Sequence, residues 1–397
     1  MPTVDSDVII KSWGFSGSFM TSNLEEKEHL VADKYQTARS LYVREHKTTK
    51  LNSTFDWNSQ SFEVEIPQSY GIVSSCWLKI TLPALQAGNY KENPGLHCLK
   101  TVELHCDSQK VYAVPFYAAM TDYLSNLNND DCKQILRNQL GRQAVPSGST
   151  RTVMIPLFLP NSHFLRRPCQ NNRRYGVFPN RLNSTSKCYW RLTLNSADHL
   201  VPNGTDAPGS IAQNCEMVCT ILRSTEGVES RFSNGSGVYS QQVPTFYEEQ
   251  DWTNASANTL VKAEILPQGS VTDVILMTRP QSNAADIEET GDYTNVQKIA
   301  LVCDSERVVD MPSKAEIDLT RLQKGEKDNP FVRQEQKITF STQIHNDSVF
   351  RGAMNFRAVS KAHVEFECDQ NVQYKIVTKR LSKVYITSNG KVRQANE

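Results

Sequence analysis

One short segment occurs twice in this chain, about half its length apart. The residues CDSQKV at Cys106–Val111, followed by Pro115, return as CDSERV at Cys303–Val308, followed by Pro312. Asp and Ser side chains hydrogen-bond nearby backbone and favour tight turns, so each copy predicts a strand, a turn and a returning strand, with no chemistry of its own. An offset of 197 in a chain of 397 residues predicts two tandem domains with the same fold.

Two further landmarks keep nearly the same spacing. EIPQ at Glu65–Gln68 has its counterpart in ILPQ at Ile265–Gln268, 200 residues later, and an apolar run that ends at Pro83 has one that ends at Pro280, 197 residues later. A collinear series of matches is the pattern that a duplicated domain leaves in a sequence. We therefore expect the strands of the second half to follow the order of the first.

The offset falls to about 174 near the end of each half, where Arg191–Thr193 matches Glu365 and its neighbours. The first half thus carries about 20 additional residues in one connection, Asn161–Lys187. Long connections in compact domains are usually functional surfaces. We expect this connection to be the main difference between the two halves.

The residues of this connection allow three interpretations: a nucleic-acid patch, a solvated loop, or a contact between subunits. The chain is neutral overall, and arginine and aromatic side chains are enriched at protein interfaces, which favours a contact between subunits over direct, sequence-specific binding of nucleic acid. The candidate intersubunit residues are Phe164, Arg166, Arg167, Arg173, Arg174, Tyr175 and Phe178.

From Ser61 onward, short β-branched and aromatic runs separated by Pro, Gly, Asn and Ser predict an all-β chain. One helical stretch, Phe116–Leu140, interrupts the first half. The strands expected in the first half are Ser61–Ile66, Cys76–Leu82, Leu96–Cys106, Arg151–Leu159, Cys188–Leu194 and Glu216–Arg223. Those expected in the second are Leu260–Leu266, Val271–Thr278, Val296–Cys303, Lys337–Ile344, Ala362–Cys368, Tyr374–Thr378 and Lys383–Thr387.

The first fifty residues follow a different pattern. Ser22 and Glu25 form a capping box, and Leu24–Lys47 is rich in Glu, Lys, Ala, Leu and Arg without Pro or Gly, which predicts an amphipathic helix. We divide the chain into an N-terminal helical arm at 1–54, a first β-domain at 55–243 and a second at 244–397.

Composition limits the classes of function. Lys plus Arg equal Asp plus Glu at 43 each, so no global field draws the chain to nucleic acid or anionic lipid. Apolar runs are far shorter than the roughly 20 residues of a membrane span, and Met1–Asp7 has no character of a secretion signal. The ten cysteines then predict reduced thiols in a cytosolic compartment.

The common enzyme motifs are absent: the sequence has no nucleophile elbow, Walker loop, dinucleotide fingerprint or zinc-protease helix. The best metal candidate pairs His97 and Cys98 with His105 and Cys106, but strand alternation places the histidines and the cysteines on opposite faces. We therefore expect a chain that is not an enzyme, with no catalytic, cofactor-binding or metal-binding residues and no cofactor.

Several segments carry a resemblance to a known family. Phe350–Arg357, the strand Ala362–Cys368 and the stretch Tyr374–Thr387 that leads to Asn389 and Gly390 resemble the end of major capsid proteins of nucleocytoplasmic large DNA viruses. Ile155–Leu157 and Trp77–Pro83 resemble two earlier strands of that family. Because the chain is short, it is more similar to the capsid proteins of tailless double-stranded DNA phages, virophages and polinton-like viruses.

This resemblance implies two eight-stranded jelly-roll sandwiches side by side, a double jelly roll. It further implies a homotrimer that forms a pseudo-hexagonal capsomer of an icosahedral shell, located in the virion after synthesis in the host cytoplasm. Implied partners are copies of the chain, minor capsid or penton proteins, and an inner membrane or scaffold reached by the N-terminal arm. The alternatives are a carbohydrate-binding or adhesion β-sandwich, since fold does not fix function, and a minor capsid component.

Overall fold

The computed structural model describes most of the chain from Tyr42 onward. The described residues are 42–51, 57, 60–107, 109–126, 130–141, 148–159, 178–179, 187–201, 215–224, 240–281, 296–323, 335–340, 353–386 and 392–396. The predicted helix Leu24–Lys47 therefore lies largely outside the described residues.

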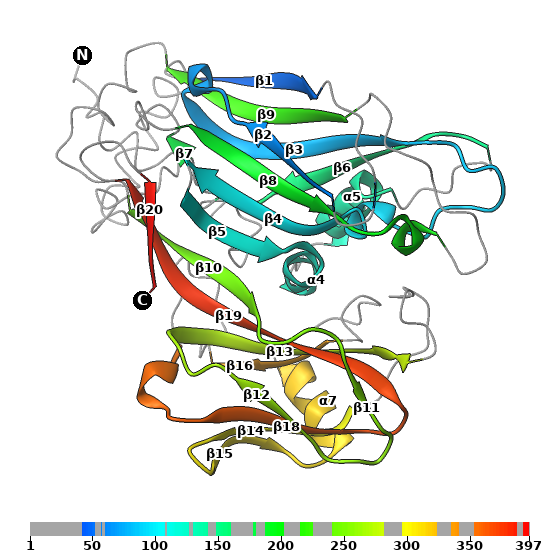
Figure 1. Ribbon diagram of the computed structural model, residues 1–397, viewed down its shortest axis with the longest axis vertical. Helices are drawn as coiled ribbons and strands as arrows, with labels where there is room; N and C mark the ends of the chain where they lie inside the picture. The colour runs from blue at the N-terminus through cyan, green and yellow to red at the C-terminus, as the bar shows by residue number, and fades with distance from the viewer. Residues whose placement is uncertain are drawn as a thin grey trace.

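Two antiparallel sheets form a first sandwich in the upper half of Figure 1. One sheet has the order β1-β9-β3-β6, with β7 added at β3, and the other has the order β2-β8-β4-β5. The strands are β1 (Tyr42–Leu51), β2 (Ser61–Glu65), β3 (Ile72–Leu82), β4 (Leu99–Cys106), β5 (Gln109–Pro115), β6 (Arg151–Leu157), β7 (Phe178–Pro179), β8 (Cys188–Leu194) and β9 (Cys215–Ser224). Two helices, α4 (Phe116–Asn126) and α5 (Asp130–Gln139), follow β5.

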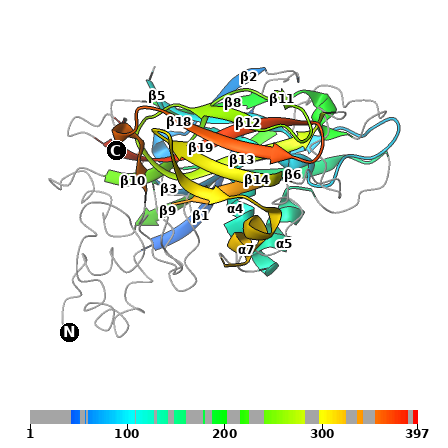
Figure 2. The same ribbon diagram turned by 90° about the horizontal axis from the view of Figure 1, so that it is seen from below.

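The second sandwich repeats this arrangement in the lower half of Figure 1. Its sheets have the orders β10-β19-β13-β16 and β12-β18-β14-β15, and the short strands β11, β17 and β20 pair at the margins of the first of them. The strands are β10 (Ser240–Glu248), β11 (Thr253–Ala255), β12 (Val261–Ile265), β13 (Ser270–Pro280), β14 (Val296–Cys303), β15 (Glu306–Met311), β16 (Glu335–Thr339), β17 (Met354–Asn355), β18 (Ala362–Cys368), β19 (Val372–Ile386) and β20 (Val392–Asn396). The helix α7 (Lys314–Gln323) follows β15 as α4 follows β5, and both helices lie on the same side of the molecule (Figure 2).

The repeated Cys-Asp turn performs the same task in both halves. Asp107 and Asp304 adopt the left-handed backbone conformation, at φ 56° and 49°. The carboxylate of Asp107 accepts a hydrogen bond from the backbone N–H of Lys187 at 3.2 Å, and that of Asp304 accepts one from Lys361 at 3.0 Å. Each turn thereby ties the end of β4 or β14 to the residue that precedes β8 or β18. Cys106 pairs with Cys188, and Cys303 pairs with Ala362. The equivalent residues of β4 and β14 are therefore 197 apart and those of β8 and β18 are 174 apart, which are the two offsets found in the sequence.

One predicted landmark is displaced by a residue. Each of β3 and β13 carries a β-bulge, and the residues that follow the bulge are Ser75 and Asp273, an offset of 198 where Pro83 and Pro280 predict 197. A slip of one residue reverses the face of every side chain, so the sequence match at the prolines assigns this strand to the wrong face.

Some predicted boundaries were wrong. The helix expected to reach Lys47 gives way at Tyr42 to β1, which pairs with β9 within the first sandwich and not outside it. Strand β10 pairs with β19 of the second sandwich along Ser240–Glu248, so the division at 243 and 244 falls inside a strand. The stretch Phe116–Leu140 forms two helices, and the two last predicted strands form the single strand β19.

Candidate functional site

The predicted intersubunit loop lies mostly outside the described residues. Of its seven candidates, Phe164, Arg166, Arg167, Arg173, Arg174 and Tyr175 are not described, and Phe178 is described only in its backbone, in β7. There Phe178 and Pro179 pair with Val73 and Ile72 of β3. The end of the loop is therefore attached to the sheet β1-β9-β3-β6.

The His and Cys residues weighed as metal ligands have other surroundings. His97 is buried and stacks on Tyr117, with ring centroids 5.7 Å apart, while His105 contacts the Glu103 carboxylate at 2.8 Å. The Cys98 thiol donates to the backbone oxygen of Pro94 at 3.3 Å, and Cys106 lies at the end of β4. No cluster of three or more candidate metal ligands occurs in the part of the chain that is described. No helix among the described residues is long and apolar enough to cross a membrane.

The two sandwiches share a core. Apolar side chains from one face of the sheet β10-β19-β13-β16 join the core of the first sandwich rather than that of the second. They come from β10, β13 and β19 and are Phe246, Ile275, Met277, Val377 and Val384. Because burial of apolar surface contributes roughly 25 cal/mol per Å², this contact fastens the two sandwiches to each other.

A group of buried charges crosses the same contact. Asp122, on α4 of the first sandwich, binds the ammonium groups of Lys337 and Lys379, the second at 2.7 Å. Asp273 lies 3.8 Å and 3.9 Å from the same two lysines. Burial by itself would raise the pKa of the Asp122 carboxyl, but the two lysines outweigh burial and hold that pKa well below its usual range. The charge pairs fix one relative position of the two sandwiches, because any shift would leave a buried charge unpaired.

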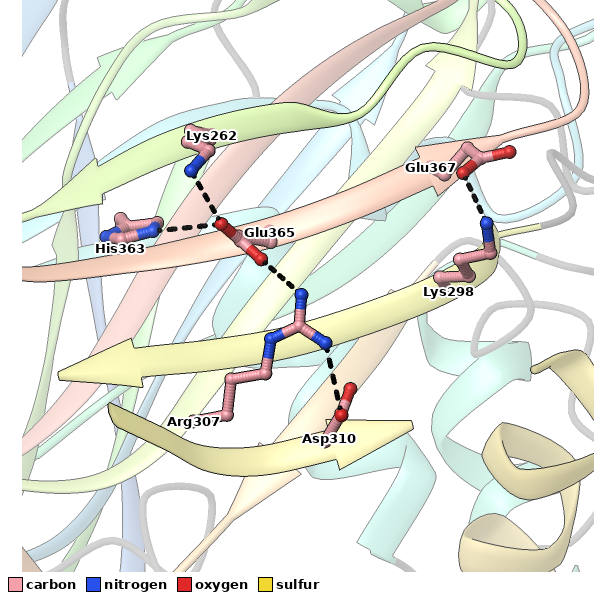
Figure 3. A network of polar contacts seen from close by, with 7 residues as sticks. All are labelled: Lys262, Lys298, Arg307, Asp310, His363, Glu365 and Glu367. Atoms are coloured by element: carbon pink, nitrogen blue, oxygen red, sulfur yellow. Dashed lines mark hydrogen bonds and ion pairs between the residues drawn. The ribbon is translucent and has the colours of Figure 1, made fainter. Parts of the chain in front are cut away.

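A ladder of charged side chains covers the outer face of the other sheet of the second sandwich (Figure 3). Glu365 on β18 receives Lys262 from β12 at 2.8 Å and Arg307 from β15 at 3.0 Å, and Arg307 also binds Asp310 at 3.2 Å. The hydrogen bond from Lys262 is the main cause that lowers the pKa of Glu365. The remaining members, His363, Lys298 and Glu367, continue the ladder along β14 and β18.

The first sandwich carries the matching ion pair with its charges reversed. Glu63 on β2 pairs with Arg191 on β8 at 3.0 Å, where the second sandwich has Lys262 on β12 and Glu365 on β18. Both pairs join directly opposed residues of the equivalent strands. The duplicated positions have kept the interaction and exchanged its polarity, so the two outer faces differ in charge pattern although their backbones match.

Comparison with known proteins identifies the fold. No family model and no curated protein matches the sequence. The structure of VP54 of the virus PBCV-1, fitted into a reconstruction of the virophage Sputnik, matches with a TM-score of 0.69 at 11% identity, over 90% of this chain and 97% of that one. The Faustovirus major capsid protein matches with a TM-score of 0.61 at 9% identity, over 88% and 91% of the two chains. The mavirus major capsid protein matches with a TM-score of 0.56 at 7% identity, over 88% and 90%.

The chain has the double jelly-roll fold. The expectation of two tandem eight-stranded sandwiches is confirmed. Among the described residues each sandwich has eight main strands, and the short strands β7, β11, β17 and β20 are additional. What sequence reasoning missed in this double jelly roll is the contact between its halves. Lys375, Lys379 and Arg380 in a long strand were the available signal, because charged residues in the middle of a buried strand need partners from another element.

Proposed function

We propose that this chain is a major capsid protein, a structural subunit that trimerises into pseudo-hexagonal capsomers and builds the icosahedral shell of a double-stranded DNA virus. The observation that carries the proposal is the side-by-side fusion of two equivalent sandwiches through a buried contact, in a fold that matches nearly the whole length of two chains named as major capsid proteins. We assign it a structural role and no catalytic one.

The geometry supports this role physically. A sandwich hides its strand edges within a double sheet, and fusion to a second copy covers one flank of each. Three such chains supply six similar wedges, which is what a hexagonal tile of a closed shell requires, and closed symmetric assemblies are the rule for oligomers of identical chains.

We further propose that the connection Asn161–Lys187 contributes contacts between subunits. Its support is composition and the attachment of Phe178 to β3. Replacement of Arg166, Arg167, Arg173 and Arg174 together by serine is expected to weaken trimers and to leave the β content in circular dichroism unchanged. Unchanged trimers combined with lost DNA or glycan binding would favour a binding patch instead.

The remaining assignments follow from the same role. The protein would reside in the virion, after synthesis in the host cytoplasm, and contact minor capsid or penton proteins at the margins of its capsomers. Residues preceding β1 would contact the inner side of the shell, a scaffold or an inner membrane.

The test is the mass and shape of the purified chain. Multi-angle light scattering at micromolar concentration is expected to give three times the chain mass of 44.8 kDa, and negative-stain microscopy a hexagonal outline. A monomer that binds defined glycans on an array would instead favour the carbohydrate-binding alternative.

A further inference from the structure

Two surfaces join the halves of one chain, and each of them has a duplicate elsewhere in the molecule that is not joined to the other duplicate. Within the chain, β5 and α4 of the first sandwich lie against the second sandwich, where β10 and β20 contact β5 and where Asp122 meets Lys337 and Lys379. The duplicates of β5 and α4 are β15 and α7. The duplicate of the sheet that receives them, β10-β19-β13-β16, is β1-β9-β3-β6. In a single chain these two duplicates belong to opposite ends of the molecule (Figure 1).

The register of the duplication is set by strand pairing. Strands β4 and β5 pair with a bulge at Val111, and β14 and β15 pair with a bulge at Val308, an offset of 197. The helices keep this offset, since Met120 of α4 and its counterpart Ile317 of α7 are both buried. By the same offset, Leu319 of α7 stands where α4 has Asp122.

The exposed side chains of β15 and α7 lie at the positions that are covered in the first half. Val111 has an exposed fraction of 1% and Asp122 of 4%, whereas Val308 is 46% and Leu319 51% exposed. Val308 and Leu319 are two of the five large apolar residues that are exposed in the described part of the chain. We call the segment Glu306–Gln323 that carries them the β15–α7 face.

The receiving sheet shows the complementary difference. In the second sandwich, Ile275 and Val377 are opposed on β13 and β19 and fully buried against the first sandwich. Trp77 lies two residues after Ser75 on β3, as Ile275 lies two residues after Asp273 on β13. Trp77 is opposed to Val218 on β9, and both side chains are partly exposed. We call the face that carries Trp77, Lys79 and Val218 the outer β3–β9 face.

The two surfaces have changed chemistry together. Where Asp122 meets two lysines inside the chain, the duplicate of Asp122 is Leu319, and the duplicates of Lys379 and Lys337 by strand register are Thr220 and Pro156. Asp273, the second acid of this group, has Ser75 as its duplicate, so four charged residues on one contact correspond to four uncharged residues on the other. A matched loss of charge on both sides fits two surfaces that meet, because a lone buried charge would be costly.

We propose that the β15–α7 face of one chain packs on the outer β3–β9 face of a second copy of this chain. The contact joins different surfaces of two identical chains, so it propagates from chain to chain and closes into a ring when the rotation permits. This inference rests on the proposed trimer and specifies which surfaces build it.

The test compares matched surface substitutions. Leu319→Asp places a charge in the proposed contact and is expected to raise the concentration at which trimers dissociate by roughly tenfold or more, as for a residue at the centre of an interface. Leu260→Asp is the control, because Leu260 is 48% exposed and adjoins β12, at the opposite edge of the same sheet from β15. The control is expected to leave the trimer unchanged, and circular dichroism is expected to show that both variants are folded.

Chemical cross-linking tests the partner surface directly. The double variant Leu319→Cys and Val218→Cys, treated with a short bismaleimide, is expected to give dimers and trimers on a denaturing gel that neither single variant gives. Trimers by light scattering without such cross-links, or trimers as stable in Leu319→Asp as in the wild type, would overturn this inference and leave the proposed function intact. A wild-type chain that is monomeric would overturn both.

Discussion

At the scale of single residues, the group of Asp122, Asp273, Lys337 and Lys379 holds the two sandwiches in one arrangement. Asp122 of the first sandwich is neutralised by two lysines of the second, which lie 215 and 257 residues further along the sequence, and Asp273 of the second sandwich lies near the same two lysines. Such a pair adds little net stability over an apolar contact, but the loss of one member is costly because the remaining charges stay buried.

The substitution Asp122→Asn is therefore expected to destabilise the chain by on the order of 3 kcal/mol, measured by chemical denaturation at pH 7. Glu63→Gln is the matched control, because Glu63 pairs with Arg191 in an exposed position, and its cost is expected to stay under about 1 kcal/mol. Equal effects of the two substitutions would contradict the role of the buried group.

His97 makes stability depend on pH. Burial, together with the nearby Lys91 and His199, lowers the pKa of His97 to about 3, whereas an unfolded imidazole titrates near 6.5. Between these values the unfolded chain binds the extra proton, so stability falls as the pH drops. His97→Phe keeps an aromatic ring beside Tyr117 and is expected to reduce this slope by up to about 1.4 kcal/mol per pH unit.

Unfolding at fixed protein concentration between pH 7 and pH 4 measures this slope. His97→Gln, which also removes the buried imidazole, serves as a second variant and is expected to reduce the slope in the same way. A His97→Phe variant with the slope of the wild type would show that the buried imidazole is not the group that titrates.

At the scale of elements, β1 is the edge strand of one sheet of the first sandwich and covers the backbone of β9. It pairs with β9 along its whole length, from Tyr42 opposite Ser224 to Leu51 opposite Cys215. Its Lys and Glu residues are of the kind that keep an exposed edge strand from pairing with other chains. The same residues are strong helix formers, which is why composition alone predicted a helix there and why pairing with β9 overrides that preference.

Truncation distinguishes the segment before β1 from β1 itself. Deletion of residues 1–40 leaves β1 complete, and the melting temperature is expected to stay within a few degrees of the wild type. Deletion of residues 1–51 exposes the edge of β9 and is expected to lower the melting temperature and cause aggregation, detected by light scattering during heating. Equal behaviour of the two truncations would contradict the structural role of β1.

The elements that could be predicted from sequence are those with clear alternation or a repeated turn. β8, β14 and β18 were predicted with their observed bounds, because inward and outward residues alternate along β8, β14 ends at the repeated Cys-Asp turn, and β8 and β18 contain the residues that match at the offset of 174. The helix α7 was missed, since Ile317 is the one buried apolar residue described on it; the capping pair Ser313 and Glu316, 3.0 Å apart, was the available signal. The buried group around Asp122 could not be predicted, because periodicity carries no information about which distant elements meet.

At the scale of the whole molecule, the duplication accounts for the fusion of the two sandwiches and for the assembly that we propose. The chain contains one complete contact between sandwiches and, at its two ends, the two surfaces of a second. In the assembly that we propose, an open contact between unlike surfaces would add chains until a ring closes, and three double sandwiches would give six units around the axis. The reversed polarity of Glu63 with Arg191 and of Lys262 with Glu365 then alternates around such a ring.

A single-particle cryo-electron microscopy reconstruction of the purified chain tests this account most directly. The expected particle contains three chains, with six sandwiches around one axis and the β15–α7 face of each chain against the β1-β9-β3-β6 sheet of the next. A monomer, or a particle in which identical surfaces meet across a two-fold axis, would contradict it.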